Sequence, residues 1–210
     1  MEGLFITFEG IEGAGKTTQL RMLAAWLTGR GFRVIETSEP DGTPLGESVR
    51  ALFEQNGLAL APITEVFLFL AARQQHVVQV IRPALERGEI VLSDRYADAT
   101  VAYQGYGRGV DLQTIRELNA LATGGIQPDL TFVLDLAAET GIQRLAGRRL
   151  DAFEKMDLAF HRRVRQGYLE IAREEKGRVA VLRAEQPLDA LQGEVRAAVE
   201  ELVRCRWERP

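Results

Sequence analysis

Residues 10–17 have the composition and spacing of a loop that holds phosphate groups. Gly10, Gly15, Lys16 and Thr17 fit the pattern G-x-x-x-x-G-K-[ST]. Glycines in such a loop let the backbone point consecutive N–H groups at phosphate oxygens, and the N-terminus of the following helix adds a positive partial charge. Lys16 can neutralise the outer phosphates, and the Thr17 hydroxyl can ligate Mg²⁺. A plain glycine turn is the alternative, disfavoured because a strand-like run precedes the pattern and a helical pattern follows it.

The loop predicts nucleotide binding, and the rest of the sequence favours ATP as the nucleotide. No Asn-Lys-x-Asp motif for guanine is present, since the only asparagines are Asn56 and Asn119. The loop also lacks the additional lysine near its start that dimeric partitioning ATPases carry. The loop residues expected to contact ATP are Gly10, Ile11, Glu12, Gly13, Ala14, Gly15, Lys16, Thr17 and Thr18.

Two aspartates at the ends of strand-like runs are candidates for the Mg²⁺ shell. Asp94 ends one such run and is followed directly by Arg95 and Tyr96, whereas Asp135 ends another. A carboxylate beside a guanidinium suits a site that meets both a metal and a second phosphate, because arginine offers a planar fork to phosphate oxygens. A structural ion pair is the alternative for Asp94, and a helix N-cap is the favoured interpretation of Asp135. Thr17 and Asp94 are therefore the predicted metal ligands.

Strand-like and helix-like segments alternate along the chain. The predicted strands are Leu4–Phe8, Arg33–Thr37, Glu89–Ser93, Leu130–Leu134 and Arg178–Leu182. The predicted helices are Thr17–Arg30, Leu45–Glu54, Thr64–Arg87, Leu112–Ala122, Ala138–Arg148, Leu158–Glu174 and Leu188–Arg204. Strands separated by helices imply right-handed crossovers and a parallel sheet. The pattern predicts an α/β fold of the three-layer, phosphate-loop (P-loop) NTP-binding type, with about five parallel strands and helices on both faces. Ligands bind such sheets beyond the carboxyl ends of the strands.

Length and composition exclude several other classes of protein. The chain has 210 residues and a net charge of −4, so a basic nucleic-acid surface is not expected. One cysteine, Cys205, excludes a disulfide scaffold, and two histidines, His76 and His161, exclude a His/Cys metal cluster. The longest apolar run, Val66–Ala72, has seven residues, too few for a membrane span. A single cytoplasmic domain over residues 1–210 is expected, with no membrane or nucleic-acid partner.

With the phosphate loop and the Asp94-Arg95-Tyr96 triplet in hand, the chain resembles the thymidylate kinases, which phosphorylate dTMP. The resemblance runs from Leu4 to about Leu202, nearly the whole chain. Its further marks are Glu39-Pro40-Asp41-Gly42-Thr43, Phe69-Leu70-Ala71-Ala72-Arg73, Ala102-Tyr103-Gln104-Gly105 and Gln127-Pro128-Asp129-Leu130-Thr131. Each of these marks is weak by itself, but together they are highly specific.

For the acceptor, the resemblance implies a base pocket around Phe69 and Arg73. Four residues apart on a helix, the two share one face. The ring can stack on a flat base while the guanidinium reaches the base edge. Taken alone, Phe69 would be assigned to the core and Arg73 to the surface. Thr100 and Gln104 would flank the base.

The resemblance also implies how the phosphate and sugar of dTMP are held. Arg95 and Arg50 would hold the phosphate, and Tyr103 would stand where a ribonucleotide carries its 2′-hydroxyl. Glu12 would contact the sugar 3′-hydroxyl or the metal shell, its alternative being a solvent-facing acid. The full set of expected dTMP contacts is Glu12, Glu39, Pro40, Arg50, Phe69, Arg73, Arg95, Thr100, Tyr103 and Gln104.

A basic segment at about residues 143–156 is expected to be a short lid. Arginines between two helices form either a solvated surface or a mobile element that brings positive charge to the transferring phosphoryl group. Family members without an arginine in the phosphate loop carry the catalytic arginine in this lid. Here that role would fall to Arg148 or Arg149, and the sequence does not choose between them. Arg144 is expected near the adenine.

Two segments depart from the family pattern. Residues 151–154 read Asp-Ala-Phe-Glu where Asp-Arg-x-Glu is usual. Residues 38–42 read Ser-Glu-Pro-Asp-Gly where Arg-Glu-Pro-Gly-Gly is usual, which removes a positive charge near the acceptor site. Either change is expected to weaken activity unless it is offset elsewhere.

The resemblance implies transfer of the ATP γ-phosphoryl group to dTMP, giving ADP and dTDP for dTTP synthesis. The second pKa of the acceptor phosphate is about 6, so it is already an anionic nucleophile at neutral pH and needs no general base. Catalysis would come from alignment and charge neutralisation by Lys16, Arg95, Mg²⁺ and a lid arginine. A homodimer is also implied, with the Thr64–Arg87 helix as a contact element.

Two other functions remain as alternatives. A kinase of deoxynucleosides would need a carboxylate base, for which Glu12 and Glu39 are available. A nucleotide-binding regulator would hydrolyse ATP slowly and signal by conformation. The arginine pair Arg50 and Arg95 argues against the first, and the lack of an appended recognition domain argues against the second.

Overall fold

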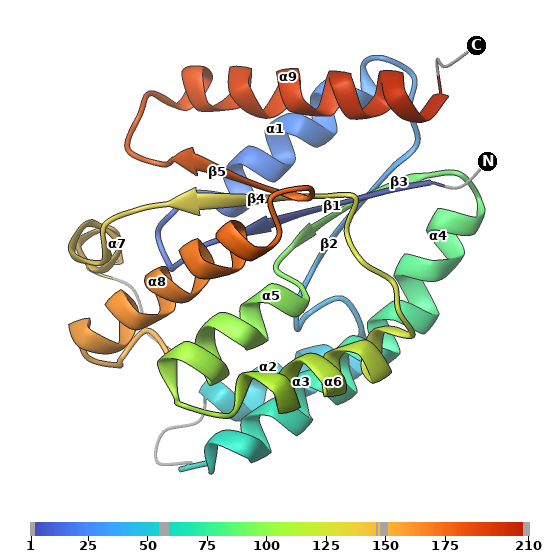
Figure 1. Ribbon diagram of the computed structural model, residues 1–210. Helices are drawn as coiled ribbons and strands as arrows, with labels where there is room; N and C mark the ends of the chain where they lie inside the picture. Colours follow the sequence, from blue (N-terminus) through green and yellow to red (C-terminus); the bar gives the residue numbers. More distant parts are fainter. Residues whose placement is uncertain (1–2, 55–58, 146, 148–150, 208–210) are drawn as a thin grey trace.

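Five parallel strands lie side by side at the centre of the computed structural model, which describes residues 3–54, 59–145, 147 and 151–207 (Figure 1). The order of the strands across the sheet is β2-β3-β1-β4-β5. Their bounds are β1 Leu4–Glu9, β2 Val34–Ser38, β3 Ile90–Asp94, β4 Leu130–Asp135 and β5 Val179–Arg183. The predicted α/β fold is confirmed, and each predicted strand lies within one residue of the observed one.

The central strand β1 brings the phosphate loop to the middle of the sheet edge. All six residues of β1 are buried, which is why its sequence is apolar almost throughout. In the register with β3, Phe8 lies opposite Asp94, and in the register with β4, Glu9 lies opposite Val133. The loop that follows β1 therefore emerges directly beside the end of β3. This alignment places Asp94 near the phosphate loop.

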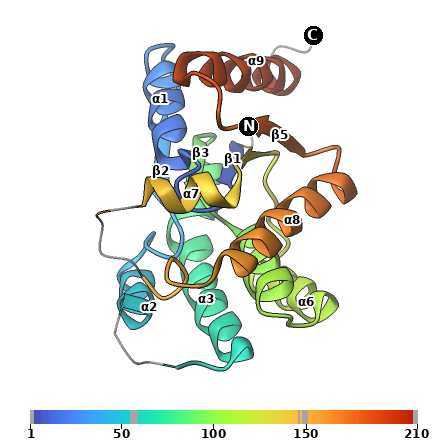
Figure 2. The ribbon, with the colours of Figure 1, turned by 90° about the vertical axis from the view of Figure 1, so that its left-hand side faces the viewer.

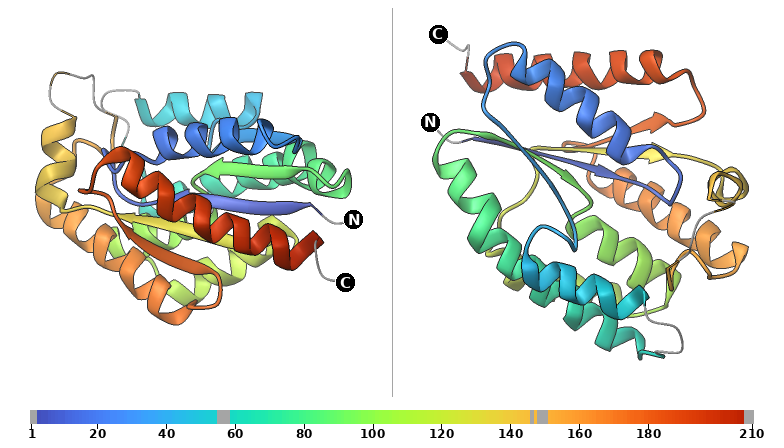
Figure 3. Two further views of the ribbon diagram at one scale, coloured as in Figure 1. Left: turned by 90° about the horizontal axis from the view of Figure 1, so that it is seen from above. Right: turned by 180° about the vertical axis from the view of Figure 1, so that it is seen from behind.

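Helices cover both faces of the sheet. Helices α1 (Lys16–Thr28) and α9 (Leu188–Trp207) pack together on one face, above the strands in Figure 1. The other face is covered by the remaining long helices (Figures 2 and 3). These include α3 Pro62–His76, α6 Leu112–Thr123 and α8 Leu158–Glu174, with α2 Pro44–Glu54 on their outer side. No helix in the described ranges is both long and apolar enough to cross a membrane.

The predicted helix Thr64–Arg87 is broken into three pieces. Helix α3 is followed by a π-helical stretch, η1 (Val77–Ile81), and then by α4 (Arg82–Glu86). Pro83 lies in the first turn of α4, where its missing N–H and its ring disrupt an α-helical ladder. The wider turn of η1 accommodates this proline without ending the helical path.

A helical segment between β3 and α6 was not predicted. It consists of α5 (Ala97–Thr100) and a π-helix, η2 (Val101–Gly107). Gly105 and Gly107 in this stretch look like helix breaks in the sequence, but both are needed for close packing on neighbouring helices. A side-chain carbon on Gly107 would lie 2.6 Å from the Phe160 ring of α8. The segment matters because it carries Tyr103 and Gln104.

Helix α7 (Ala138–Arg144) is shorter than predicted. Leu145 is its C-cap, whereas the expected end was Arg148, a residue outside the described ranges. Figure 2 shows α7 directly in front of the sheet edge, across the end where the phosphate loop lies.

Candidate functional site

A cavity of about 670 Å³ lies at the carboxyl ends of β1, β2 and β3. It contains most of the residues that the sequence nominated. The predicted residues that line it are Glu12, Gly13, Gly15, Lys16, Thr17, Thr18, Glu39, Pro40, Arg50, Phe69, Arg73, Asp94, Arg95, Thr100, Tyr103 and Gln104. The structure thus joins the phosphate loop and the proposed acceptor residues in one continuous space.

The phosphate loop depends on left-handed glycines. Gly10 has φ +134°, and a side-chain carbon there would lie 2.6 Å from the Leu134 carbonyl oxygen. Gly13 has φ +74° and would meet the Gly141 carbonyl at 2.8 Å. The side chains of Ile11 and Ala14 are buried in the core, so these two residues can offer a ligand only their backbone.

The Lys16 ammonium group is folded back against its own loop. Nζ donates to the carbonyl oxygens of Gly10 at 3.1 Å and Ile11 at 3.0 Å. Burial, with Arg95 nearby, lowers the pKa of Lys16 to about 8. These two contacts place the amine close to the loop centre. Phosphate oxygens bound there would raise its pKa again and so favour the charged form.

The two predicted metal ligands are in direct contact. Thr17 Oγ1 donates to Asp94 Oδ2 at 2.5 Å, and both residues line the cavity. A hydroxyl and a carboxylate are hard oxygen donors, the kind that Mg²⁺ prefers alongside phosphate oxygens and water. The residues present therefore fit a magnesium ion at the end of the phosphate loop.

Asp135 does not cap a helix, and that prediction is wrong. Its two carboxylate oxygens accept from Arg165 Nε at 2.6 Å and Nη2 at 2.9 Å. The cap of α7 is Ala137, which has no side-chain hydrogen bond. Because Arg165 lies 30 residues further along the chain, only the packing of α8 beside β4 brings the pair together.

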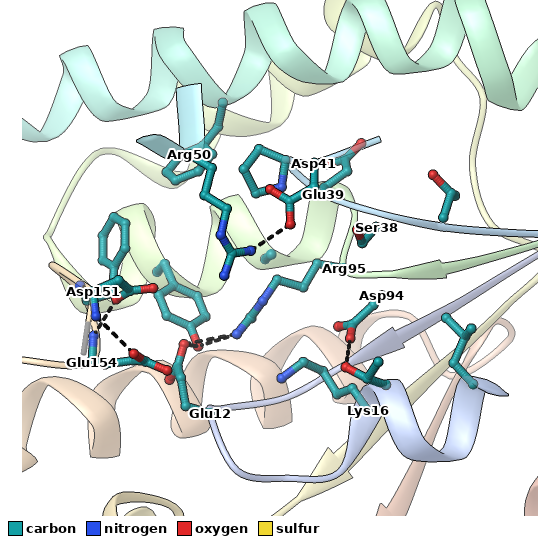
Figure 4. A pocket seen from close by; sticks show the side chains of 18 of the residues that line it. Glu12, Lys16, Ser38, Glu39, Asp41, Arg50, Asp94, Arg95, Asp151 and Glu154 are labelled. Atoms are coloured by element: carbon teal, nitrogen blue, oxygen red, sulfur yellow. Dashed lines mark hydrogen bonds and ion pairs between the residues drawn. The ribbon is translucent and has the colours of Figure 1, made fainter. Parts of the chain in front are cut away.

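Arg95 stands at the middle of the site in a strained conformation. Its φ is +75°, a left-handed value that is uncommon for a residue other than glycine. Its guanidinium donates to Glu12 Oε1 at 2.9 Å and Tyr103 Oη at 3.2 Å, and on its other side to Gly10 O and Tyr168 Oη, both at 3.3 Å. The unusual backbone aims this side chain across the cavity toward Glu12 (Figure 4).

Glu12 is ionised and held by several groups. Tyr103 Oη donates to its Oε1 at 2.5 Å, and His161 Nδ1 lies 3.6 Å from its Oε2. Burial by itself would raise the pKa of Glu12, but His161, Arg95 and Lys16 hold it well below its usual range. Glu12 lines the cavity, and its contact with a sugar hydroxyl or a metal shell stays a prediction.

Arg73 is buried, and every nitrogen of its guanidinium has a protein partner. Nε donates to Glu39 Oε2 at 2.8 Å, and Nη2 donates to the Tyr96 carbonyl at 2.9 Å. Nη1 donates to Thr100 Oγ1 at 3.0 Å and Asn119 Oδ1 at 2.7 Å. A ligand carbonyl can therefore reach Arg73 only by sharing or replacing a hydroxyl acceptor such as Thr100.

Phe69 belongs both to the core and to the cavity wall. Its ring stacks on Phe53 with a centroid distance of 4.7 Å and an interplanar angle of 5°. Phe153, which the sequence places in the expected lid, lies 5.9 Å away, tilted by 42°. All three rings line the cavity, so this end of it has an aromatic wall.

Arg50 reaches the cavity from α2 but is paired there with an acid. Its Nη1 donates to Asp41 Oδ2 at 2.6 Å, and its Nε donates to Glu54 at 3.1 Å. Burial raises the pKa of Asp41 even though Arg50 opposes this effect. Asp41 is one of the residues at which the sequence departs from the family pattern, and here it forms an ion pair with Arg50.

The family model of thymidylate kinase matches residues 8–195. A thymidylate kinase of Deinococcus radiodurans is 52% identical over 201 residues, covering 95% of this chain and 98% of the relative. The chain belongs to the thymidylate kinase family. This family phosphorylates dTMP to dTDP with ATP as donor. A thymidylate kinase of Desulfovibrio desulfuricans is 47% identical, covering 97% of this chain and 98% of the relative.

Solved structures agree with the sequence comparison. A crystal structure of thymidylate kinase from Ehrlichia chaffeensis superposes with a TM-score of 0.78 at 36% identity. It covers 95% of this chain and 99% of the other. The five-stranded sheet and its surrounding helices are thus the thymidylate kinase fold.

Residues 151–154, which the sequence assigns to the lid, dock on α2. The Ala152 N–H donates to the Phe53 carbonyl at 3.2 Å, and Asp151 and Glu154 form a reciprocally hydrogen-bonded turn. The two acids of the family's Asp-Arg-x-Glu pattern therefore stabilise this turn, even though alanine replaces the arginine. Arg144 Nη1 donates to the Gly13 carbonyl at 2.9 Å, against the phosphate loop. Arg148 and Arg149, the predicted catalytic arginines of the lid, lie outside the described residues.

Sequence reasoning missed several buried polar residues around the site. Glu9 accepts from the Tyr96 N–H at 2.7 Å and from Tyr168 Oη at 2.8 Å, and burial raises its pKa to about 8. Asn119 holds Arg73 from 46 residues away, a contact that carries no local signal. His76 had a signal, because it lies three residues after Arg73 and so shares its helical face.

Proposed function

We propose that this chain transfers the γ-phosphoryl group of ATP to dTMP, giving ADP and dTDP. One observation carries the proposal: a single cavity holds the phosphate loop at one end and the Phe69–Arg73 pair at the other, with Arg95 between them. Two anionic substrates brought together there would meet Lys16 in the phosphate loop and Arg95 and Arg50 further along the cavity wall. The full-length match to thymidylate kinases supports the same reaction.

The phosphate loop is the proposed donor site. Its backbone from Gly10 to Thr18 would surround the ATP phosphates, and Lys16 would neutralise the outer ones. Arg144, held against Gly13, lies on the outer side of the loop, where the adenosine would extend. When ATP binds, its phosphate oxygens would replace the loop carbonyl oxygens as the hydrogen-bond acceptors of Lys16.

Thr17 and Asp94 would hold Mg²⁺ together with the nucleotide. When bound, the ion would neutralise charge on the β- and γ-phosphate oxygens. The hydrogen bond between Thr17 and Asp94 supports this assignment, because it brings the two oxygens within 2.5 Å of each other. Asp135 is committed to Arg165 and is not proposed as a ligand.

The acceptor phosphate would lie between Arg95 and Arg50. Both guanidinium groups border the cavity, and Figure 4 shows both pointing into the same space. The pKa of Arg95 lies well above its usual value, because Tyr103, Tyr168 and Glu12 outweigh the effect of burial, so its charge is permanent. Arginine's planar fork fits phosphate oxygens in a bidentate way.

The sugar and base of dTMP would lie between Tyr103 and Phe69. Tyr103 is buried and bonded to Glu12, so it forms a rigid wall where a 2′-hydroxyl would project. Phe69 would stack on the thymine ring, and Thr100 and Gln104 would border its edge. Glu39 and Pro40 would close the same end of the pocket.

No side chain has to remove a proton from the acceptor. The dTMP phosphate is anionic at neutral pH because its second pKa is about 6. The residues of the site would act by aligning the two substrates and neutralising their charge. Arg148 or Arg149 would add positive charge from the lid; separate alanine variants of the two would identify which one lowers kcat.

A homodimer is proposed through the α3 face. Ile63, Phe67 and Val78 are exposed apolar residues on α3 and η1, and Leu121 is exposed on α6, the helix that packs against α3. Phe67 is 55% exposed and Leu121 78%, which are large fractions for apolar side chains on a helix pair. Light scattering of wild-type protein and of Phe67→Glu would test this arrangement, with a monomeric mass expected only for the variant.

The use of ATP also fits a cytoplasmic location.

The deciding experiment measures ADP release with MgATP and a panel of acceptors. The panel contains dTMP, dUMP, dCMP, dGMP, AMP and free thymidine. Fast turnover with dTMP supports the proposal. Turnover with thymidine instead would require a general base and would overturn the acceptor assignment. Slow ADP release that ignores every acceptor would point to a regulator.

A further inference from the structure

His76 is fully buried and contacts two residues of the cavity wall without lining the cavity itself. Its Nδ1 lies 3.2 Å from Glu39 Oε1, and its Nε2 lies 2.6 Å from Thr37 Oγ1. Glu39 and Thr37 both border the cavity, as does Arg73 on the same helix. His76 therefore stands directly behind the wall that holds the base end of the site.

The hydrogen-bond roles of His76 follow from its partners. Burial would raise the pKa of Glu39, but Arg73 and His76 hold it below its usual value, so Glu39 is a carboxylate and can only accept. Nδ1 must then carry the hydrogen and donate. The other ring nitrogen, Nε2, faces the Thr37 hydroxyl, from which it can accept. Every polar atom of the ring has a partner in this arrangement.

The ring is also fixed by close packing against the acceptor loop. A side-chain carbon on Gly42 would lie 2.4 Å from the His76 ring. The loop that carries Glu39 and Asp41 thus rests on the imidazole with no space between them. Any movement of the ring would shift the Glu39 carboxylate.

Glu39 passes this restraint to Arg73. Its Oε2 accepts from Arg73 Nε at 2.8 Å, while its Oε1 faces His76. Arg73 Nη1, on the opposite side of the guanidinium, points at Thr100 Oγ1, which borders the cavity. An arginine can only donate, so a nucleobase must present a carbonyl there and not an amino group.

We propose that His76 is a positioning residue for base selection. His76 holds the Glu39 carboxylate in place, and Glu39 in turn orients the guanidinium of Arg73. The N–H groups of Arg73 can then donate to a carbonyl of thymine, whereas cytosine presents an amino group there. The inference rests on the proposed function, because dTMP must be the acceptor for this edge to read its base. His76 touches no substrate, so its effect falls on selectivity and not on the phosphoryl-transfer step.

The test compares His76→Leu, which removes both hydrogen bonds, with His76→Asn, whose amide can replace the Nδ1–H donor. For His76→Leu, we expect the ratio of kcat/KM for dTMP to that for dCMP to fall about tenfold, through a higher KM for dTMP. The KM for ATP and kcat with dTMP should change less than twofold. His76→Asn should restore most of the ratio. His161→Asn, at the other buried histidine, is the control; it contacts Glu12 and should leave the ratio unchanged even if activity falls.

Wild-type protein supplies an independent measurement. Because the chain has only two histidines, long-range ¹⁵N–¹H NMR can identify the tautomer of each ring. We expect one histidine with Nδ1 protonated and Nε2 bare, its assignment given by the spectrum of His76→Asn. An Nε2-protonated, Nδ1-bare His76 would overturn the proposal, as would a wild-type ratio in His76→Leu. If wild-type protein does not phosphorylate dTMP at all, the proposed function fails first.

Discussion

Thr17 Oγ1 donates to Asp94 Oδ2 at 2.5 Å, which joins the first turn of α1 to the end of β3. The contact follows from the sheet register, because Asp94 is paired with the last apolar residue of β1. We expect Thr17→Val, which keeps the shape and loses the oxygen, to lower kcat/KM by about 10–100-fold and to raise the Mg²⁺ concentration needed for half-maximal rate. A magnesium titration of the steady-state rate measures both effects.

Thr17→Ser is the matched control for that prediction. It keeps the hydroxyl and should stay within a few-fold of wild type. Equal losses in Thr17→Val and Thr17→Ser would show that the methyl packing matters and that the oxygen is not a ligand.

Asp41 is expected to compete with the acceptor phosphate for Arg50. The two side chains are 2.6 Å apart, and that of Arg50 is 49% exposed, so the pair contributes at most about 1 kcal/mol. Asp41→Gly should therefore lower the KM for dTMP by about two- to fivefold while kcat stays nearly constant. Initial rates at saturating ATP measure this change.

Glu54→Gln is the control for the Arg50 pair. It removes the second acid on the same guanidinium, away from the cavity lining, and should change the KM for dTMP less than Asp41→Gly does. A higher KM in Asp41→Gly would mean that Asp41 orients Arg50 and does not compete with the substrate.

Glu9 makes the stability of the fold depend on pH. Burial, with Asp98 nearby, raises the pKa of Glu9 from 4.5 to about 8. Between these values the native state holds a proton that the unfolded chain has lost, so the free energy of unfolding falls as pH rises from about 4.5 to 8. Glu9→Gln has no proton to lose there. We expect it to be more stable than wild type at pH 8.5 by about 1–3 kcal/mol and similar near pH 5.

Urea unfolding at several pH values checks the Glu9 prediction. Glu86→Gln, which alters an exposed acid on α4, should follow the wild-type pH dependence. A Glu9→Gln variant that is destabilised equally at every pH would show that the carboxylate is needed for its bonds to Tyr96 and Tyr168, and that it is ionised in the native protein.

Much of the fold and the phosphate site could be predicted because their signals are local. Strands that are buried on both faces of the sheet have continuous apolar runs in the sequence. The loop from Gly10 to Thr17 needs particular residue types at fixed spacing. Asp94 was also within reach, since parallel strands end at one edge of the sheet. The assignments of Thr17 and Asp94 rest on such regularities.

The remaining polar framework could not be predicted, because its partners meet only through tertiary packing. Asp135 looks like a cap in sequence, but Arg165 reaches it from α8. Asn119 and His76 contact Arg73 and Glu39, respectively. Asn119 carries no local signal, and the position of His76 on the helical face of Arg73 does not reveal Glu39 as its partner. The η2 segment was hidden because glycines chosen for helix packing look like breaks in a helix.

Phe153 closes the end of the cavity that Phe53 and Phe69 also line. Its ring lies 5.3 Å from Phe53, 5.9 Å from Phe69 and edge-on to Tyr103 at 5.8 Å, and it is only 9% exposed. Such ring pairs contribute about 0.5–1.5 kcal/mol each beyond the area they bury. Phe153→Ala should weaken lid docking and lower kcat/KM for dTMP by about tenfold, mainly through KM.

Phe153→Leu separates the two contributions of this side chain. Leucine keeps most of the apolar volume and should recover at least half of the loss in binding free energy, measured as kcat/KM for dTMP. The neighbouring hydrogen bond from Ala152 to Phe53 remains available in both variants, and the thermal unfolding temperature should fall less for Phe153→Leu than for Phe153→Ala. A lower KM for dTMP in Phe153→Ala would reverse the interpretation, because the ring would then be occupying the space that thymine needs and not closing it.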